Sequence, residues 1–231
     1  MSRSRRIARA AALAALAPLL AVAGLVAWSA PPAPFPPRDR PPQPGPVPER
    51  IVVLGTSLSA RSDWPAALEA ALSDCLGRPA SVAVVARPGA SSAWGMGQVE
   101  RVAAHAPDLV VVEFAVNDAD LLNGLRPGRS ASAHEVILSE LAALAPEARL
   151  VLMTMSPAFG PRGWARPRLE AHYALYPHLA ARHGAGLVDL YPRWLARPEP
   201  PRELLPDGLH PTDAAARAVI LPPLLAALGC A

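Results

Sequence analysis

The chain has 231 residues, of which 52% are hydrophobic and 18% charged, so it can form one packed domain and does not have the composition of a disordered protein. Its net charge of +3 arises in the first 30 residues, which hold four of the 22 basic residues and no acidic one. The rest of the chain carries 18 arginines against 19 acidic residues without a basic run, which disfavours nucleic-acid binding.

The first predicted element is a targeting segment. Residues 1–9 are basic and residues 10–28 are apolar, a length between those of a secretory signal and a membrane span. We therefore expect residues 1–30 to be a signal peptide or an N-terminal signal anchor. The remainder would then be periplasmic, or tethered to the inner membrane through residues 10–28 and facing the periplasm. Residues 31–48 are rich in proline and are expected to form an extended linker.

Residues 49–231 alternate short apolar runs with helical patterns and are predicted to form a single domain. Strands are expected over residues 51–54, 80–86, 108–114, 149–154 and 186–191. Helices are expected over residues 62–75, 94–105, 130–144, 168–183 and 212–228. This alternation predicts an α/β fold with a five-stranded parallel sheet covered by helices on both faces. Ligands of such sheets bind at the carboxyl ends of the strands.

A serine and a histidine–aspartate pair follow this rule. Ser57 comes directly after the first expected strand, in a Gly-x-Ser-Leu turn. Serine needs a base to become nucleophilic, and Asp207 precedes His210 by three residues, which places both on one side of a single turn. We therefore expect Ser57, Asp207 and His210 to be catalytic.

The same edge offers donors for the oxyanion that develops in acyl transfer. Gly89 follows the second strand and presents a backbone N–H without a side chain in the way. Asn117 follows the third strand and presents a neutral amide. Together with the Ser57 N–H, these groups are expected to form an oxyanion hole and to bind substrate.

At this point the chain resembles a known family, the SGNH or GDSL hydrolases. Gly55-Thr56-Ser57-Leu58-Ser59, Gly89, Val116-Asn117-Asp118 and Asp207-x-x-His210-Pro211 look like its four consensus blocks, in the family's order. The likeness extends over residues 50–229. It implies a flavodoxin-like three-layer α/β/α fold and hydrolysis of esters or thioesters through an acyl-enzyme.

Two residues depart from the family pattern. Thr56 stands where the family has the aspartate of Gly-Asp-Ser-Leu, which puts the geometry of the local turn in question. Ala115 stands where glycine is usual in the Gly-x-Asn-Asp block, and its methyl group could crowd the pocket or shift Asn117.

These features predict a serine esterase acting on small-molecule, glycan or lipid esters, such as acetyl esters, thioesters or lysolipids. Two alternatives stay open: an acyltransferase with the same triad, and a non-catalytic carbohydrate- or lipid-binding relative. No cofactor or metal is expected, because the first turn lacks a glycine-rich phosphate cradle and the other histidines lack the spacing of metal ligands. The oligomeric state is not predicted.

Two further features are left with two interpretations each. Residues 156–166 follow the fourth strand at the same edge and are either a wall of the substrate pocket or an exposed loop. Cys75 and Cys230 could form a disulfide in an exported protein or remain separate thiols.

Overall fold

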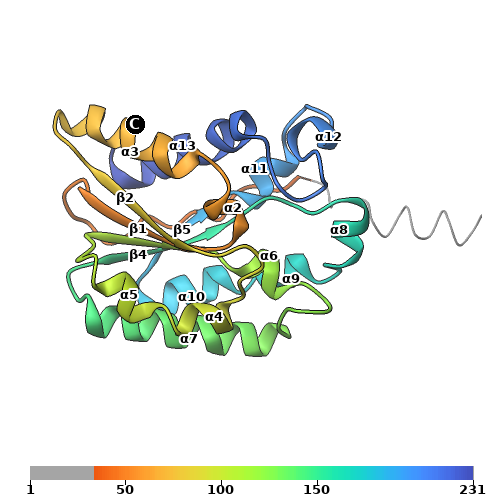
Figure 1. Cartoon of the computed structure of the whole chain (residues 1–231), viewed down its shortest axis with the longest axis horizontal. Coiled ribbons are helices and arrows are strands. Elements are labelled where there is room, and N and C mark those ends of the chain that lie inside the picture. The colour runs from red at the N-terminus through yellow and green to blue at the C-terminus, as the bar shows by residue number, and fades with distance from the viewer. Residues whose placement is uncertain (1–33, 231) are drawn as a thin grey trace, which may run out of the picture. The chain divides into compact units, whose positions relative to one another are not determined.

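The protein is described here by a computed structural model that covers residues 34–230. Its centre is a five-stranded parallel sheet with the strand order β2-β1-β3-β4-β5 (Figure 1). The strands are β1 (Arg50–Gly55), β2 (Ser81–Ala86), β3 (Leu109–Val112), β4 (Arg149–Thr154) and β5 (Gly186–Asp189). This is the flavodoxin-like order, so the predicted α/β fold is confirmed.

The strands form where β-branched and aliphatic residues run together. All four residues of β3 are buried, and all but the first of β1 and of β4 are buried or nearly so. A strand at the centre of a parallel sheet is covered by helices on both faces, and it therefore reads as a continuous apolar run rather than an alternating one. Strand β2 lies at the edge of the sheet and is more exposed.

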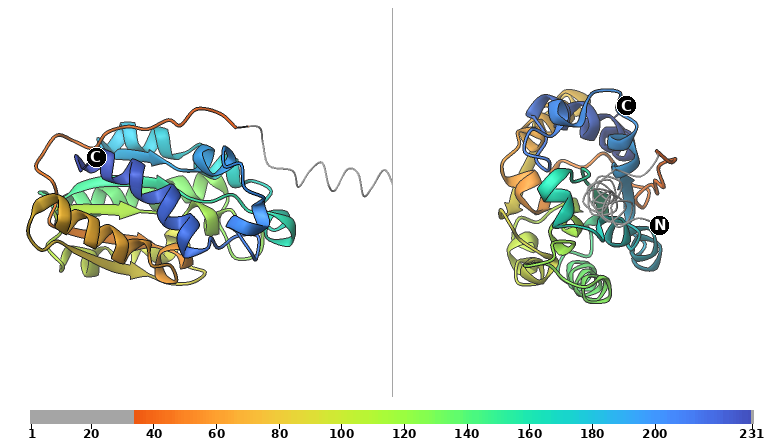
Figure 2. Two further views of the ribbon diagram at one scale, coloured as in Figure 1. Left: turned by 90° about the horizontal axis from the view of Figure 1, so that it is seen from above. Right: turned by 90° about the vertical axis from the view of Figure 1, so that its right-hand side faces the viewer.

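Helices cover the sheet in two layers (Figures 1 and 2). One layer holds α3 (Trp64–Leu76) and α13 (Asp213–Leu228), and the other holds α4 (Ser92–Met96), α5 (Val99–Ala103), α7 (Pro127–Leu144), α9 (Leu169–Tyr173) and α10 (Tyr176–His183). Shorter helices follow the carboxyl ends of strands: α2 (Ser57–Ala60), α6 (Ala115–Asp118), α8 (Gly160–Trp164), α11 (Tyr191–Leu195) and, beyond it, α12 (Pro201–Leu204).

Two helices that the sequence predicts as continuous are divided. The helix expected over residues 94–105 is α4 followed by α5, with Gly97 between them. Glycine is among the poorest helix formers. The helix expected over residues 168–183 is α9 followed by α10, and Pro177 lies in the first turn of α10. Proline there lacks an N–H and its ring clashes with the carbonyl one turn earlier, so a single helix cannot continue through it.

The described part of the predicted linker belongs to the domain. Residues 34–48 are extended, as their prolines require, but they run along the domain instead of away from it (Figure 2). Arg40 forms an antiparallel bridge to Leu187 of β5, with N···O distances of 3.0 and 2.8 Å. Strand β5 is an edge strand, so the backbone groups on its outer side need partners. Arg40 supplies them, because it has a backbone N–H as well as a carbonyl. The described part of the segment predicted as a linker, residues 34–48, is thus extended and paired with the edge of the sheet at Arg40.

A disulfide joins Cys75 at the end of α3 to Cys230 after α13, with a Cα–Cα distance of 5.8 Å. It settles the question that the sequence left open. Because its two cysteines are separated by 155 residues, the bond closes almost the whole domain into one loop. Such a cross-link stabilises a fold mainly by restricting the unfolded chain.

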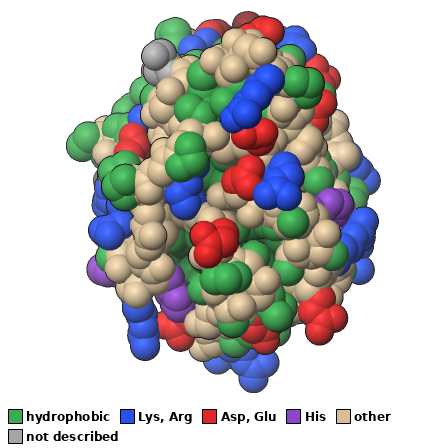
Figure 3. Space-filling model, turned by 90° about the vertical axis from the view of Figure 1, so that its left-hand side faces the viewer, with side chains coloured by type: hydrophobic (Ala, Val, Ile, Leu, Met, Phe, Trp, Pro, Cys, Tyr) green, Lys and Arg blue, Asp and Glu red, His purple; other side chains and the backbone are tan. Residues whose placement is uncertain are grey.

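The amino ends of the strands form a charged face. Asp108 accepts hydrogen bonds from the backbone N–H groups of Glu49 and Arg50 at 3.0 and 2.8 Å, and pairs with the Arg50 guanidinium at 2.8 Å. The view of this end shows acidic and basic side chains interspersed (Figure 3). Within residues 34–230, no helix is long and apolar enough to cross a membrane. The predicted signal peptide or anchor, residues 1–30, lies outside the described residues.

Candidate active site

The structure brings Ser57, His210 and Asp207 together at the carboxyl end of the sheet. Ser57 is the first residue of α2, directly after β1, and its Oγ lies 2.8 Å from Nε2 of His210. The other ring nitrogen of His210, Nδ1, lies 2.7 Å from Oδ2 of Asp207. The turn that holds His210 leads into α13, whose N-terminus is capped by the Thr212 hydroxyl accepting from the Ala215 N–H. A serine, a histidine and a carboxylate thus form one hydrogen-bonded chain.

The charge of Asp207 sets the tautomer of His210. Although partial burial acts to raise the pKa of Asp207, the backbone N–H and the ring of His210 and the backbone N–H of Leu209 donate to its carboxylate and lower the pKa to about 2. An ionised Asp207 accepts from Nδ1–H of His210. Nε2 is then an acceptor, and the Ser57 hydroxyl donates to it.

Residues 156–166 lie beside this triad. The Phe159 N–H donates to the Gly208 carbonyl at 2.7 Å, and the Ser156 hydroxyl donates to the Leu209 carbonyl at 3.0 Å. A surface cavity of about 470 Å³ lies next to Asp207, between this segment and the α12 region. Of the two interpretations of residues 156–166, the structure favours a wall beside the site, although Trp164 itself remains 47% exposed.

Gly89 and Asn117 lie on adjacent turns that are bonded to each other. The Asn117 side-chain amide donates from Nδ2 to the Ala90 carbonyl at 3.0 Å, next to Gly89. Gly89 has a φ of +75°, a conformation that side-chain-bearing residues rarely adopt, so glycine is required there by the backbone rather than by a lack of space. The Ser57 N–H occupies the first position of α2, where a helical N–H has no acceptor within the helix.

A buried arginine, Arg166, contacts Asn117. From the sequence, Arg166 was expected only as part of a possible pocket wall. Arg166 donates from Nε to the Val116 carbonyl at 2.8 Å, and its Nη2 lies 3.5 Å from Asn117 Oδ1 and 3.2 Å from Asp120 Oδ2. The Asn117 oxygen therefore faces Arg166, and its Nδ2 faces the Ala90 side. Ala115 is 2% exposed, so its methyl group packs into the core and does not fill the site.

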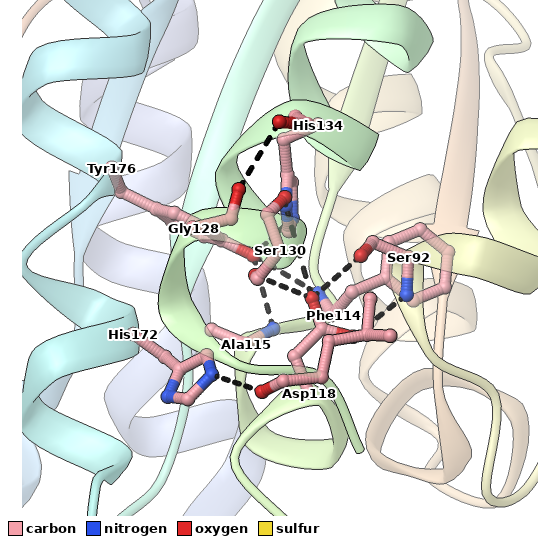
Figure 4. A network of polar contacts seen from close by, with 11 residues as sticks. Ser92, Phe114, Ala115, Asp118, Gly128, Ser130, His134, His172 and Tyr176 are labelled. Carbon is pink, nitrogen blue, oxygen red and sulfur yellow. Dashed lines mark hydrogen bonds and ion pairs between the residues drawn. The ribbon is translucent and has the colours of Figure 1, made fainter.

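A buried polar network supports this part of the site from below (Figure 4). Asp118 accepts from the Ser92 N–H at 2.8 Å, and from the Ser92 and Ser130 hydroxyls at 2.6 Å each. It thereby ties α6, which carries Asn117, to the start of α4 and to α7. Asp118 was quoted in the family motif, but the sequence indicated none of these partners.

The histidine in this network is structural. The Tyr176 hydroxyl accepts from the N–H groups of Phe114 and Ala115 at 3.0 and 3.1 Å, so it donates to Nε2 of His134. Nδ1 of His134 donates to the Ser130 carbonyl at 2.8 Å, and burial lowers the pKa of His134, which favours its neutral form. Among the described residues, no group of three or more His, Cys, Asp or Glu side chains could hold a metal ion.

A second buried carboxylate, Glu113, lies beneath the serine turn and was missed by the sequence interpretation. It follows β3 and accepts from the Thr56 N–H at 2.6 Å and from the Ser59 hydroxyl at 2.7 Å. The available signal was an acidic residue at the end of the run Leu-Val-Val-Val, where a buried strand should have none.

Comparisons with known proteins agree with this geometry. The model of the family described as GDSL-like Lipase/Acylhydrolase matches residues 51–218. A lipase/acylhydrolase from Enterococcus faecalis is 23% identical, with a TM-score of 0.65 over 79% of this chain and 93% of that one. A hydrolase from the metagenome of Lake Arreo, Spain, is 24% identical, with a TM-score of 0.62 over 80% and 97%.

A catalytic mutant of an acetylxylan esterase from Geobacillus stearothermophilus is 16% identical, with a TM-score of 0.64 over 78% of this chain and 94% of that one. These three likenesses show a shared fold. The comparison with curated proteins gives no match.

Proposed function

The chain belongs to the GDSL-like lipase/acylhydrolase family and is a carboxylic ester hydrolase, and we propose that it works through an acyl-enzyme formed on Ser57. The observation that carries this proposal is the hydrogen-bonded chain from Ser57 Oγ through His210 to Asp207, with distances of 2.8 and 2.7 Å. The departures from the family pattern at Thr56 and Ala115 do not interrupt these hydrogen bonds.

In the first half of the reaction, Ser57 Oγ attacks the carbonyl carbon of the ester while Nε2 of His210 takes the serine proton. The carbonyl electron pair moves onto its oxygen, and the imidazolium that forms is stabilised by the ionised Asp207. When the intermediate collapses, the bond to the alcohol oxygen breaks, and His210 returns its proton to that oxygen. The acyl group stays on Ser57.

In the second half, water replaces the alcohol. His210 removes a proton from the water as its oxygen attacks the acyl carbon, and then protonates Ser57 Oγ as the acid leaves. In both halves we assign stabilisation of the oxyanion to the N–H groups of Ser57 and Gly89 and to Nδ2 of Asn117. Donors aimed at the developing charge are typically the largest single contribution to such a reaction.

We propose short acyl esters, such as acetyl esters of sugars, and also thioesters and lysolipids, as the substrate class. The test is hydrolysis of p-nitrophenyl esters from acetate to decanoate by the full chain, beside Ser57→Ala. The matched control is Ser132→Ala, because Ser132 is an exposed serine on α7 whose hydroxyl bonds only its own helix at the Gly128 carbonyl.

We expect hydrolysis by the wild type and by Ser132→Ala, and none above background by Ser57→Ala. A fluorophosphonate should add covalently to Ser57 in the first two proteins alone. Equal turnover by Ser57→Ala contradicts the serine assignment. An enzyme that labels at Ser57 but releases acyl groups only to an added alcohol is an acyltransferase, and one that neither labels nor hydrolyses is a binding relative.

We also propose that the chain is exported to the periplasm, free or tethered through residues 10–28. Two observations support this: the basic and then apolar composition of residues 1–30, and the Cys75–Cys230 disulfide, because disulfides are rare in reducing compartments. Expression of the full chain in a Gram-negative host, followed by fractionation and mass measurement, tests it. Full-length protein found in the cytosol contradicts export.

A further inference from the structure

We propose that Glu113 is a positioning residue of this enzyme: its carboxylate holds residues 56–59 in place and so directs the Ser57 hydroxyl toward His210. The inference rests on the proposed role of Ser57 and adds a residue outside the triad and the oxyanion donors. Glu113 touches no reacting atom. It acts on the turn that carries the nucleophile.

The contacts of Glu113 bracket Ser57 on both sides. Before it in the chain, Thr56 donates to the carboxylate from its N–H at 2.6 Å and from its hydroxyl at 3.0–3.1 Å. After it, the Ser59 hydroxyl donates at 2.7 Å. All three residues, Thr56, Ser59 and Glu113, are at most 2% exposed, so water cannot replace these bonds. A Cβ at Gly55 would overlap the carboxylate, which explains why the strand ends in glycine.

The donor set favours the ionised form of Glu113. Oε1 accepts from the Thr56 N–H, the Thr56 hydroxyl and the Ser59 hydroxyl, and Oε2 shares the Thr56 hydroxyl. A carboxylate accepts at both oxygens, whereas a protonated carboxyl must itself donate a hydrogen. The Thr56 hydroxyl, which already accepts from the Leu58 N–H at 3.2 Å, would then accept from the carboxyl instead of donating to it. The bonds from the Thr56 N–H and the Ser59 hydroxyl would go to an uncharged oxygen and would be weaker.

Burial opposes this ionised form. Desolvation raises the pKa of Glu113 to about 7, in spite of the three hydrogen bonds, which lower it. Its hydrogen-bond partners within residues 34–230 are neutral. The titratable groups that interact with its charge are Tyr173 and Tyr176, and burial raises the pKa of both phenols, so they stay neutral near pH 7. The hydrogen bonds that hold the turn are therefore stronger above neutral pH, where Glu113 is charged, although the desolvation of that charge lowers the stability of the whole fold there.

Thr56 is a residue type that can donate a hydrogen bond to the Glu113 carboxylate. Its hydroxyl caps α2 through the Leu58 N–H and donates to the carboxylate at the same time. The aspartate that the family carries at this position would bring a second carboxylate against Glu113, and like charges in a buried site repel. The residue that departs from the family pattern is thus bonded to a residue 57 positions further along the chain.

The test compares Glu113→Gln with the wild type in the full chain. We expect kcat to fall by roughly tenfold to a hundredfold with KM little changed, because the Ser57 hydroxyl is displaced while the substrate contacts remain. The acid limb of the pH profile of kcat/KM should have a steeper log slope in the wild type than in Glu113→Gln, because the wild type also loses the charge of Glu113 there.

The matched control is Glu69→Gln. Glu69 also accepts from a backbone N–H, that of Val82 at 2.8 Å, but it lies on α3 away from the site. We expect its kcat and its pH profile to equal those of the wild type. A purely structural role for Glu113 predicts lower stability in Glu113→Gln with an unchanged slope, and that result overturns the proposal.

Ser59→Ala keeps the inference testable if Glu113→Gln does not fold. Removing one donor to the carboxylate disfavours its charged form, so the acid limb should move upward by about half a pH unit to one unit. An unmoved limb overturns the proposal. Ser57→Ala, assayed in parallel, separates the two hypotheses: if it is as active as the wild type, the proposed function fails, whereas if it is inactive and Glu113→Gln is normal, only the role of Glu113 fails.

Discussion

Two buried carboxylates support the two halves of the site with the same set of donors. Glu113, beneath the Ser57 turn, accepts from one backbone N–H and from the hydroxyls of Thr56 and Ser59. Asp118, beneath the Asn117 turn, accepts from one backbone N–H and from the hydroxyls of Ser92 and Ser130. Each carboxylate joins a turn after one strand to a neighbouring segment.

The two differ in what surrounds them. Asp118 has the His134 ring 3.8 Å away, inside a network that continues to Tyr176 (Figure 4), whereas the partners of Glu113 are hydroxyls and a backbone N–H. Burial raises the pKa of Glu113 to about 7. Of the two carboxylates, Glu113 is the one whose pKa is raised to near neutrality, and it belongs to no catalytic motif.

We expect loss of a proposed oxyanion donor to change activity the most. Asn117→Ala should lower kcat by about 100- to 1,000-fold with a small change in KM, because the lost Nδ2 donor acts on the transition state more than on the bound ester. Steady-state kinetics on p-nitrophenyl acetate measure it. A rise in KM at constant kcat would instead make Asn117 a substrate-binding residue. The turn that carries Asn117 would then contribute to binding and not to the chemical step.

The next effect is the pH dependence of stability on the serine side. The pKa of Glu113 is raised from 4.5 to about 7, so the folded protein keeps this proton over a range in which the unfolded chain loses it. The stabilisation from this group is complete below about pH 4.5 and is lost as pH rises through about 7. Relative to Glu113→Gln, the wild type should lose about 3 kcal/mol between these pH values.

Urea unfolding of the wild type and Glu113→Gln at pH 5 and pH 8 measures that change. Glu69→Gln is the control and should parallel the wild type at both pH values. If the free energy of unfolding changed equally with pH in all three proteins, Glu113 would be ionised at both pH values. Its pKa would then not be raised to near neutrality.

A smaller loss is expected from Asp118→Asn. The amide keeps the size of the carboxylate but has one acceptor oxygen for three donors, so at least one buried donor is left without a partner. The free energy of unfolding should fall by about 2 kcal/mol. Urea unfolding at pH 7 checks it, and an unchanged free energy of unfolding would show that these three bonds do not stabilise the fold.

The smallest effect tests the match between Thr56 and Glu113. Thr56→Asp should lower kcat by about tenfold, because a second buried carboxylate repels Glu113 and loosens the turn. Adding Glu113→Gln to Thr56→Asp should recover part of that loss, and a double-mutant cycle measures the coupling. Strictly additive effects would show that the two side chains do not depend on each other.

Local patterns carried much of the prediction. Apolar runs such as that of β3 were sufficient to predict the order of the elements and the parallel sheet. The glycines and polar residues that follow the strands were sufficient to indicate the family. The same patterns pointed to Ser57, Asp207 and His210, and the structure places these three within hydrogen-bond distance. Helix breaks were predicted less well, since the division between α9 and α10 depends on one proline inside an otherwise helical pattern.

The fold and the candidate triad could be predicted from the sequence because the periodicity of burial and the types of residues at strand ends are local properties of the chain. Three features could not be predicted in this way: residues 34–48 cover β5, Cys75 is bonded to Cys230, and Glu113 accepts from the turn that carries Ser57. Each of these joins residues far apart in the chain. Their physical cause is common: an exposed strand edge or a buried charge needs a partner, and which partner comes within reach is set by packing.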